Sequence, residues 1–255
     1  MLHSFSDTVE PPKDRNLIVL VELLNRHYAD KTAHEVLNDV MNVYFKGKIT
    51  LVSSFGAEAA VLLHMASRVD PTMPVLLVDT LMLFQETLDY QHDLSALFGL
   101  TDVRRITPDA EILAKQDRFD ALHMTDPDRC CDIRKVQPLA QALLPFDAVI
   151  SGRKRFQASS RKNLQLFELD DVGQIRVNPL AHWDATMLRE YALEYDLPLH
   201  PLVPKGFLSI GCKPCTTAVA PGEDERAGRW RGTAKVECGI HIGAVGAVQH
   251  QVQGA

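Results

Sequence analysis

Residues 49–69 read ITLVSSFGAEAAVLLHMASRV and contain a predicted strand, a turn and a helix in immediate succession. The part Ile49–Phe55 is apolar and rich in strand-forming residues, and it ends at Gly56. The part Ala57–Val69 consists of good helix formers with apolar residues at helical spacing. This stretch predicts a buried strand that leads through a tight turn into a helix.

The same alternation of strand and helix continues along the chain. Apolar strands are predicted at Pro74–Thr80, Val103–Thr107 and Asp147–Gly152. Helices are predicted between them at Leu83–Phe98 and Cys131–Leu144. Strands that are apolar on both faces and alternate with helices indicate an α/β fold, with a mainly parallel twisted sheet and helices on both faces.

Further elements are expected on either side of this core. Two helices, Asn16–Tyr28 and Thr32–Phe45, precede the first strand. Two β-like runs, Leu164–Leu169 and Ile175–Leu180, extend the sheet, and a helix follows at Ala185–Tyr195. After these elements Gly, Pro, Cys and charged residues dominate. We therefore expect an α/β domain over residues 1–204 and a loop-rich, cysteine-bearing segment over residues 205–255.

The overall composition excludes several classes of protein. The chain of 255 residues is 46% hydrophobic and 24% charged, as in an ordinary globular protein. No apolar run approaches the roughly 18 residues needed to span a bilayer. The apolar stretch Leu17–Leu24 follows acidic rather than basic residues, so we expect no signal sequence and a cytosolic protein. The net charge of −6 argues against general nucleic-acid binding.

Basic residues are nevertheless concentrated in one stretch. Between Arg153 and Lys162 the chain has five basic residues and no acidic residue. This stretch follows a predicted strand directly, and Arg153, Arg155 and Arg161 carry planar guanidinium groups that suit phosphate or sulfate oxygens. The pattern favours a local anionic ligand. A solvated basic surface is the alternative.

Small and polar residues stand at the ends of the first two strands. The first turn consists of Ser53, Ser54, Phe55 and Gly56. Backbone N–H groups and the N-terminus of the following helix can bind an anion there, although such a turn is often only a turn. Asp79 and Thr80 end the next strand, where they can contact a ribose or base, or can simply cap the strand end.

Four of the five cysteines form two pairs. An odd number of cysteines without a signal peptide argues against structural disulfides and favours metal binding or thiol chemistry. The pairs are Cys130-Cys131, beside a predicted helix start at Asp126-Pro127, and Cys212-Lys213-Pro214-Cys215 in a turn. Four thiolates brought together by the fold suit zinc or an iron–sulfur cluster. A redox-active C-x-x-C or unrelated buried cysteines remain open alternatives.

The fifth cysteine lies near the C-terminus in Glu237-Cys238-Gly239-Ile240-His241. A single cysteine among small and polar residues is a candidate attacking thiol. Nearby cations can favour its thiolate form, namely Arg226, Arg229, Lys235 and His241. The alternative is an incidental surface cysteine.

With these motifs in chain order, the sequence resembles the assimilatory adenylyl-sulfate and phosphoadenylyl-sulfate reductases over about residues 53–243. The motifs are the SFGA turn, Asp79-Thr80, the GRKR-x-Q loop, Asn178-Pro179-Leu180, the CC and C-x-x-C pairs and the terminal ECG-x-H. The resemblance is strongest over residues 201–215 and 221–241. Each motif is weak alone, but together they are specific.

The resemblance implies both a fold and a reaction. The fold is that of the adenine nucleotide alpha hydrolase-like proteins, with a nucleotide-binding domain and a mobile C-terminal catalytic tail. The reaction is the thioredoxin-dependent reduction of adenosine 5′-phosphosulfate to sulfite and AMP in sulfate assimilation, through an S-sulfocysteine at Cys238 with His241 beside it. As in relatives with both cysteine pairs, a 4Fe–4S cluster would be held by Cys130, Cys131, Cys212 and Cys215.

The resemblance also implies substrate contacts and partners. The expected contacts are Ser53, Ser54, Phe55, Gly56, Asp79, Thr80, Arg153, Arg155, Arg161, Arg226 and Arg229. The expected partners are adenosine 5′-phosphosulfate and reduced thioredoxin, with no nucleic acid and no membrane. The sequence leaves open a homo-oligomer, glutaredoxin as the electron donor and phosphoadenylyl sulfate as the substrate.

One departure from the family pattern concerns the second turn. The family often has Gly after Asp-Thr, whereas this chain has Leu81. A left-handed backbone at Leu81 would cost about 1–2 kcal/mol, which weakens the assignment of Asp79 and Thr80 as nucleotide contacts.

Two other classes of protein are compatible with parts of the pattern. One is an ATP-using enzyme of the same superfamily, although the S-G-G-x-D-S turn of those enzymes does not match this sequence. The other is a zinc-stabilised nucleotide-binding module.

Overall fold

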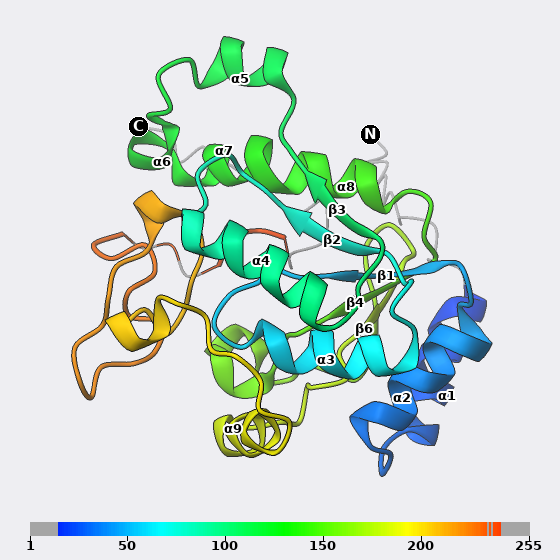
Figure 1. Ribbon diagram of the computed structural model, residues 1–255. Coiled ribbons are helices and arrows are strands. Elements are labelled where there is room, and N and C mark those ends of the chain that lie inside the picture. Colours follow the sequence, from blue (N-terminus) through cyan, green and yellow to red (C-terminus); the bar gives the residue numbers. More distant parts are fainter. Residues whose placement is uncertain (1–14, 234, 236, 241–255) are drawn as a thin grey trace, which may run out of the picture.

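The computed structural model describes residues 15–233, 235 and 237–240 (Figure 1). Its centre is a six-stranded sheet in the order β3-β2-β1-β4-β6-β5. The strands are β1 (Ile49–Val52), β2 (Val75–Val78), β3 (Val103–Ile106), β4 (Ala148–Ser151), β5 (Phe167–Leu169) and β6 (Ile175–Val177). Neighbouring strands are parallel, except that β5 runs antiparallel to β6. The prediction of an α/β fold with a mainly parallel sheet is confirmed.

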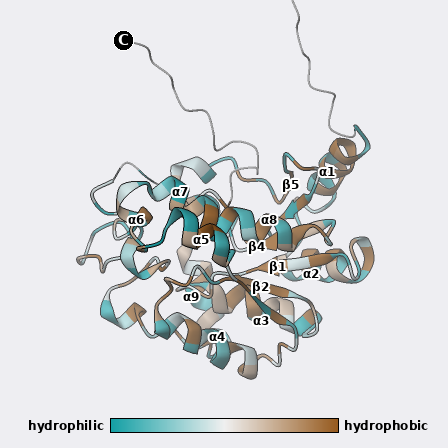
Figure 2. Ribbon diagram, turned by 90° about the horizontal axis from the view of Figure 1, so that it is seen from above, coloured by the Kyte–Doolittle hydropathy of each residue, from teal (hydrophilic) through white to brown (hydrophobic). Residues whose placement is uncertain are grey.

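Alternate residues of the strands face two separate cores. In β2, Val75 and Leu77 belong to the larger core, whereas Leu76 and Val78 pack with α8. All four residues are buried, which explains why this strand is apolar without alternation. Figure 1 shows α3, α4 and α9 on one face of the sheet and α8 on the other, and in Figure 2 the central strands are brown. These helices are α3 (Ala59–Val69), α4 (Gln85–Leu97), α8 (Gln137–Leu143) and α9 (Ala185–Glu194).

The N-terminal helices cover the end of the sheet that holds β5. Helix α1 spans Arg15–His27 and α2 spans Ala33–Asp39. The Asn25 side chain accepts a hydrogen bond from Phe167 N–H at 3.0 Å and donates one to the Phe167 carbonyl at 2.8 Å. Asn25 thus satisfies backbone groups that an edge strand would otherwise leave unpaired.

Two of the predicted helices contain π-helical turns. The expected helix Thr32–Phe45 is α2 followed by a π turn at Val40–Tyr44. The expected helix Cys131–Leu144 begins earlier, as α7 (Pro127–Cys131), and continues through a π turn at Asp132–Val136 into α8. Pro138 lies at the start of α8 and has no N–H to donate to the preceding turn. A wider turn before it avoids the clash that an α-helical turn would make.

Two short helices were not predicted from the sequence. They are α5 (Ala110–Gln116) and α6 (Leu122–Thr125), and neither buries a residue. A helix without a buried face has no apolar period, so the pattern gave no signal. The start of α7 was predicted correctly, because the Asp126 side chain accepts a hydrogen bond from Arg129 N–H and Pro127 occupies the first helical turn.

The segment from Lys205 onward contains little regular structure. Its regular part is a 3-10 turn at Lys213–Cys215, and isolated bridges join Leu83 to Cys212 and Thr216 to Arg229. Figure 1 shows this segment, in orange, beside the end of the sheet where the parallel strands finish. Within the part of the chain that the structure describes, we find no helix with the length and apolar character required to cross a bilayer.

Candidate active site at the carboxyl ends of the strands

A cavity of about 390 Å³ lies where β1 and β4 end side by side. The chain passes from β1 to β2 and β3 on one side, and then returns to β4 on the other side of β1. Such a reversal leaves a crevice outside the carboxyl ends of the two strands, which is the usual ligand site of open α/β sheets. The turn after β1 and the basic loop after β4 both line this cavity.

The turn after β1 is shaped by one buried side chain and one glycine. Phe55 has a positive φ of 47° and is fully buried, and its N–H donates to Ser53 Oγ at 3.1 Å. A Cβ at Gly56 would lie 3.2 Å from Ser54 Oγ and 3.4 Å from the Ile210 carbonyl oxygen. Ser53, Ser54 and Gly56 line the cavity just before α3 begins, whereas the Phe55 side chain belongs to the core.

The turn after β2 has a left-handed backbone at Leu81, a conformation that costs free energy at a residue other than glycine. Leu81 has φ 62°, and its N–H donates to Asp79 Oδ1 at 3.0 Å. Thr80 Oγ1 accepts a hydrogen bond from Met82 N–H and lies 3.2 Å from Cys212 Sγ. Thr80 lines the cavity and Asp79 does not. The Asp79 carboxylate therefore stabilises the turn itself, and Thr80 joins the turn to the cysteine-bearing segment.

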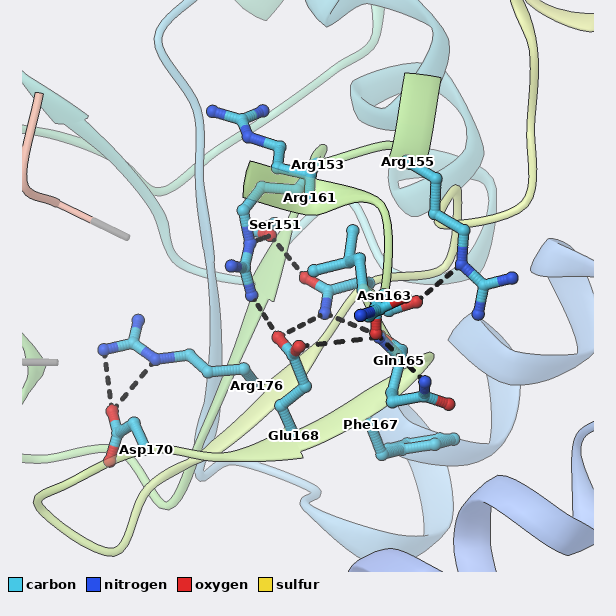
Figure 3. A network of polar contacts seen from close by, with 12 residues as sticks. Ser151, Arg153, Arg155, Arg161, Asn163, Gln165, Phe167, Glu168, Asp170 and Arg176 are labelled. Carbon is cyan, nitrogen blue, oxygen red and sulfur yellow. Dashed lines mark hydrogen bonds and ion pairs between the residues drawn. The ribbon is translucent and has the colours of Figure 1, made fainter. Parts of the chain in front are cut away.

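The basic loop after β4 places its cations in three different settings. Arg153 forms an ion pair with Glu168 at 2.5 Å, and Arg161 forms one with Glu237 at 2.9 Å; both arginines line the cavity. Arg155 is outside the cavity wall, because its Nε donates to the Leu164 carbonyl at 2.7 Å. Figure 3 shows Arg153 and Arg155 directed to these separate partners.

The two pairs of cysteines come from opposite sides of the site. Cys130 and Cys131 lie in α7, and Cys212 and Cys215 lie at the 3-10 turn; all four are free thiols. Burial raises the pKa of Cys130 to about 12, and the charges of its three cysteine neighbours act in the same direction. The four thiols are thus near enough to influence one another. Among the described residues, however, no three His, Cys, Asp or Glu side chains already stand at positions for a metal ion.

The thiol of Cys212 is influenced by nearby cationic and hydroxyl groups. Burial raises the pKa of this thiol, but the ammonium group of Lys135 and the hydroxyl group of Thr80 outweigh burial, so the pKa is lowered. Burial lowers the pKa of Lys135, but the negative charges of Cys212, Cys238 and Cys131 outweigh burial. The pKa is therefore raised, and Lys135 is held as a cation. In the described part of the chain, the buried Nε atoms of Arg229 and of the Trp230 indole (Nε1) have no hydrogen-bond partner.

The ECG segment reaches the same cavity. Glu237, Cys238 and Ile240 line it, together with Arg226 and Arg229. Ile240 also packs against the smaller core, the one that holds α8. His241, the other residue expected in catalysis, lies outside the described residues.

Several cavity residues were not among the site residues predicted from the sequence. Lys154 is 2% exposed and forms an ion pair with Glu58 at 2.7 Å, and Gln157 also donates to Glu58. Lys135 and Trp230 line the cavity as well. The pairing of Lys154 with Glu58 had a usable signal, because each residue follows one of two strands that neighbour each other in the sheet.

Comparisons with known proteins point in one direction. A profile of the family described as "Phosphoadenosine phosphosulfate reductase domain" matches residues 48–218. The chain is 50% identical over 209 residues to an adenosine 5′-phosphosulfate reductase of Mesorhizobium japonicum, covering 82% of each protein. It is 38% identical over 225 residues to a phosphoadenosine 5′-phosphosulfate reductase of Gloeobacter violaceus, covering 87% of this chain and 93% of that protein. The fold matches the crystal structure of a phosphoadenylyl-sulfate reductase from Candida auris in a phosphate complex, with a TM-score of 0.65. The two sequences are 27% identical, and the match covers 77% of this chain and 96% of the other.

Proposed function

Because the chain belongs to the phosphoadenosine phosphosulfate reductase domain family, we propose that it reduces adenosine 5′-phosphosulfate to sulfite and AMP. One observation carries this proposal above the others. Cys238 lines the same cavity as residues of the two strand-end turns and Arg153 and Arg161 of the basic loop. A nucleophile, a nucleotide-sized crevice and a set of cations therefore meet at one place.

The proposed reaction has two chemical steps. The Cys238 thiolate attacks the sulfur atom of the sulfuryl group, the bond between that sulfur and the bridging phosphate oxygen breaks, and AMP leaves. Cys238 then carries an S-sulfonate. A dithiol reductant attacks the Cys238 sulfur, sulfite leaves with the bonding electron pair, and the second thiol of the reductant resolves the mixed disulfide. The dithiol supplies both electrons.

The cavity cations are suited to the charges of this reaction. Lys135 is held as a cation and lines the same cavity as Cys238, so it can balance negative charge of the substrate or the attacking sulfur. We assign Arg153, Arg161, Arg226 and Arg229 to the phosphate and sulfate oxygens of the substrate. Planar guanidinium groups suit such oxygens, and AMP leaves more readily when cations balance its charge. Ser53, Ser54, Gly56 and Thr80 would contact the nucleotide from the two strand ends.

We further propose that Cys130, Cys131, Cys212 and Cys215 hold a 4Fe–4S cluster. Four thiols are the donor set that such clusters use, and the unpartnered N–H groups of Arg229 and Trp230 would find acceptors in cluster sulfur atoms. When bound, the cluster would supply a fixed negative charge and a covalent link between α7 and the C-terminal segment. The two electrons of the reaction come from the dithiol.

The reductant and the cellular site follow from the same chemistry. The five cysteines are all free thiols, which suits the reducing cytoplasm. We propose thioredoxin as the dithiol, since the S-sulfonate on the ECG segment must be presented to a partner protein. We divide the chain functionally into the nucleotide-binding domain of residues 1–204 and the catalytic segment of residues 205–255.

Phosphoadenylyl sulfate is the second candidate substrate. The Gloeobacter violaceus relative and the Candida auris structure both bear the name of reductases for that nucleotide. The presence of both cysteine pairs favours adenosine 5′-phosphosulfate, in line with the Mesorhizobium japonicum relative.

One experiment tests the proposal as a whole. The protein is purified without oxygen, its visible spectrum and iron content are recorded, and sulfite is measured with each nucleotide and reduced thioredoxin. We expect a brown protein that contains iron and forms sulfite faster from adenosine 5′-phosphosulfate. A colourless zinc protein would contradict the cluster. Absence of sulfite from both nucleotides would contradict the reaction.

A further inference from the structure

The carboxylate of Glu237 occupies one edge of a guanidinium group in the cavity wall. Arg161 Nε and Nη2 each donate to a different oxygen of Glu237, both at 2.9 Å. The remaining nitrogen, Nη1, donates to Gln157 Oε1 at 2.7 Å. Every nitrogen of the Arg161 guanidinium is therefore engaged. An oxyanion of a ligand can take the Nε and Nη2 edge only after the Glu237 carboxylate has left it.

A second arginine shares the same carboxylate. Arg226 Nη2 lies 3.4 Å from Glu237 Oε2. The side chains of Arg161 and Glu237 are only 10% and 11% exposed, so solvent screens this pair weakly. Two guanidinium groups around one buried oxyanion form the kind of site that proteins use for phosphate and sulfate. In this structure the carboxylate of Glu237 is the anion in that site.

The position of Glu237 in the chain links this contact to the reactive thiol. Cys238 is the next residue and lines the cavity. The same segment is held on both sides, by an ion pair of Lys235 with Asp128 and by the packing of Ile240 against the smaller core. Of these contacts, the ion pairs of Glu237 lie nearest to Cys238 in the chain, and they are made with arginines that line the cavity.

We propose that Glu237 is a positioning residue for Cys238. Its carboxylate binds the Arg161–Arg226 subsite in the ligand-free protein, holds the thiol segment at the cavity, and yields the subsite to the oxyanion group of a sulfated nucleotide. The proposal rests on the proposed function, because that function assigns both arginines to the substrate. It adds that substrate binding and release of the thiol segment are coupled by exchange of one anion for another.

The test compares Glu237→Gln with a matched control, Glu223→Gln. Glu223 lies in the same segment and also pairs with an arginine, Arg231 at 3.0 Å, but it does not line the cavity. Both variants are checked for folding by circular dichroism. The first readout is the rate at which iodoacetamide alkylates Cys238 without nucleotide, measured by peptide mass spectrometry. We expect the alkylation rate to rise about tenfold in Glu237→Gln, because the segment opens more often once the ion pair is lost. The rate should not change in Glu223→Gln.

The second readout is the affinity for AMP, measured by titration calorimetry. Removal of the internal anion should tighten AMP binding by about fivefold or more in Glu237→Gln, because no carboxylate has to be displaced. Glu223→Gln should bind AMP as the unmodified protein does. Unchanged alkylation, or unchanged or weaker AMP binding, in Glu237→Gln would overturn the proposal. Neither readout requires turnover, so failure of the sulfite assay and failure of this inference are separate results.

If Glu237→Gln does not fold, the unmodified protein provides the same test. Sulfate competes with the Glu237 carboxylate for the two guanidinium groups, so it should raise the alkylation rate of Cys238 above the rate in sodium chloride of equal ionic strength. Equal rates in the two salts would contradict the role of Glu237.

Discussion

The sheet and the C-terminal segment are held together by different forces. In β2 and β4 every residue is buried, and parallel hydrogen bonding joins them to their neighbours. In residues 205–240, the hydrophobic residues buried within the described part are Ile210, Cys212 and Trp230. Backbone hydrogen bonds in turns, two isolated bridges and several ion pairs add further contacts. The sheet is stable through apolar burial, whereas the segment that contains the proposed nucleophile depends mainly on polar contacts.

This difference suggests how the protein combines a fixed binding crevice with a movable nucleophile. The crevice belongs to strand ends that the core fixes in place. The proposed nucleophile, Cys238, belongs to a segment whose contacts can be exchanged without disturbing that core. Changes in the cysteines or ion pairs should therefore affect the segment first.

The largest expected effect is that of Cys212→Ser. Loss of one of four thiolates should remove most of the iron and with it the link between α7 and the C-terminal segment. We expect iron content and sulfite formation to fall together, and trypsin to cleave the segment after its lysines and arginines. The sheet should keep its circular dichroism. A variant with full iron content would contradict the four-ligand assignment, and a variant with an unfolded sheet would contradict the comparison itself.

The next effect concerns a buried ion pair beside the end of the sheet. Arg134 is 1% exposed, pairs with the buried Asp117 at 2.7 Å and donates to the Thr80 carbonyl at 3.0 Å. Arg134→Met leaves the Asp117 carboxylate buried without its partner, and should lower the free energy of unfolding by about 3–5 kcal/mol. Urea unfolding measures this value.

The matched control for that variant is an exposed ion pair. Lys115 pairs with Glu111 at 3.4 Å, and both side chains are largely exposed. Lys115→Met should change the free energy of unfolding by less than about 0.5 kcal/mol. Equal losses in the two variants would show that the buried pair has no special role.

A smaller effect depends on pH. His200 is fully buried, its Nδ1 accepts from Leu202 N–H, and its Nε2 lies 3.0 Å from Thr87 Oγ1. Burial lowers the pKa of His200 to about 4, against 6.5 in the unfolded chain. The unfolded state binds the proton more tightly, so this contribution is present above pH 6.5 and is lost as the pH falls toward 4. The loss amounts to about 3 kcal/mol.

Urea unfolding at a series of pH values checks this effect. The free energy of unfolding of His200→Gln should depend less on pH in this window than that of the unmodified protein. The same replacement at the exposed His34 should leave the dependence as it is. Identical pH profiles for His200→Gln and the unmodified protein would contradict the assignment.

The smallest effect is at the left-handed turn after β2. Leu81 has φ 62° and is 59% exposed, so Leu81→Gly relieves backbone strain while losing little contact. Relief of about 1–2 kcal/mol exceeds the entropy that glycine adds to the unfolded chain, so we expect a gain of up to about 1 kcal/mol in the free energy of unfolding. Leu23→Gly, at a similarly exposed position inside α1, should instead lose about 1 kcal/mol. A loss at both positions would contradict the strain.

The fold could be predicted further than the site. The central strands are buried on both faces, so they require unbroken apolar runs that are easy to recognise. The strands and the main helices were therefore predicted at nearly their observed positions. The helices α5 and α6 were missed because a helix without a buried face has no apolar period in the sequence. The two π turns were also missed, and only the one at Asp132–Val136 precedes a proline.

Within the site, the sequence indicated which residues carry charge but could not show what each charge faces. The basic loop was recognised, yet its order along the chain did not reveal that Arg155 binds the Leu164 carbonyl while Arg161 binds Glu237. Such pairings depend on contacts between distant parts of the chain. The left-handed backbone at Leu81 was recognised as costly, and the turn adopts it because Asp79 and Thr80 stabilise it.

The central claim is that Cys238 is the nucleophile, and one measurement tests it most directly. The protein is incubated with adenosine 5′-phosphosulfate in the absence of any reductant and then analysed by peptide mass spectrometry. We predict one added sulfonate group on the peptide that contains Cys238, together with one AMP released per chain, and neither product in Cys238→Ser. A sulfonate on another cysteine, or AMP release that persists in Cys238→Ser, would contradict the account.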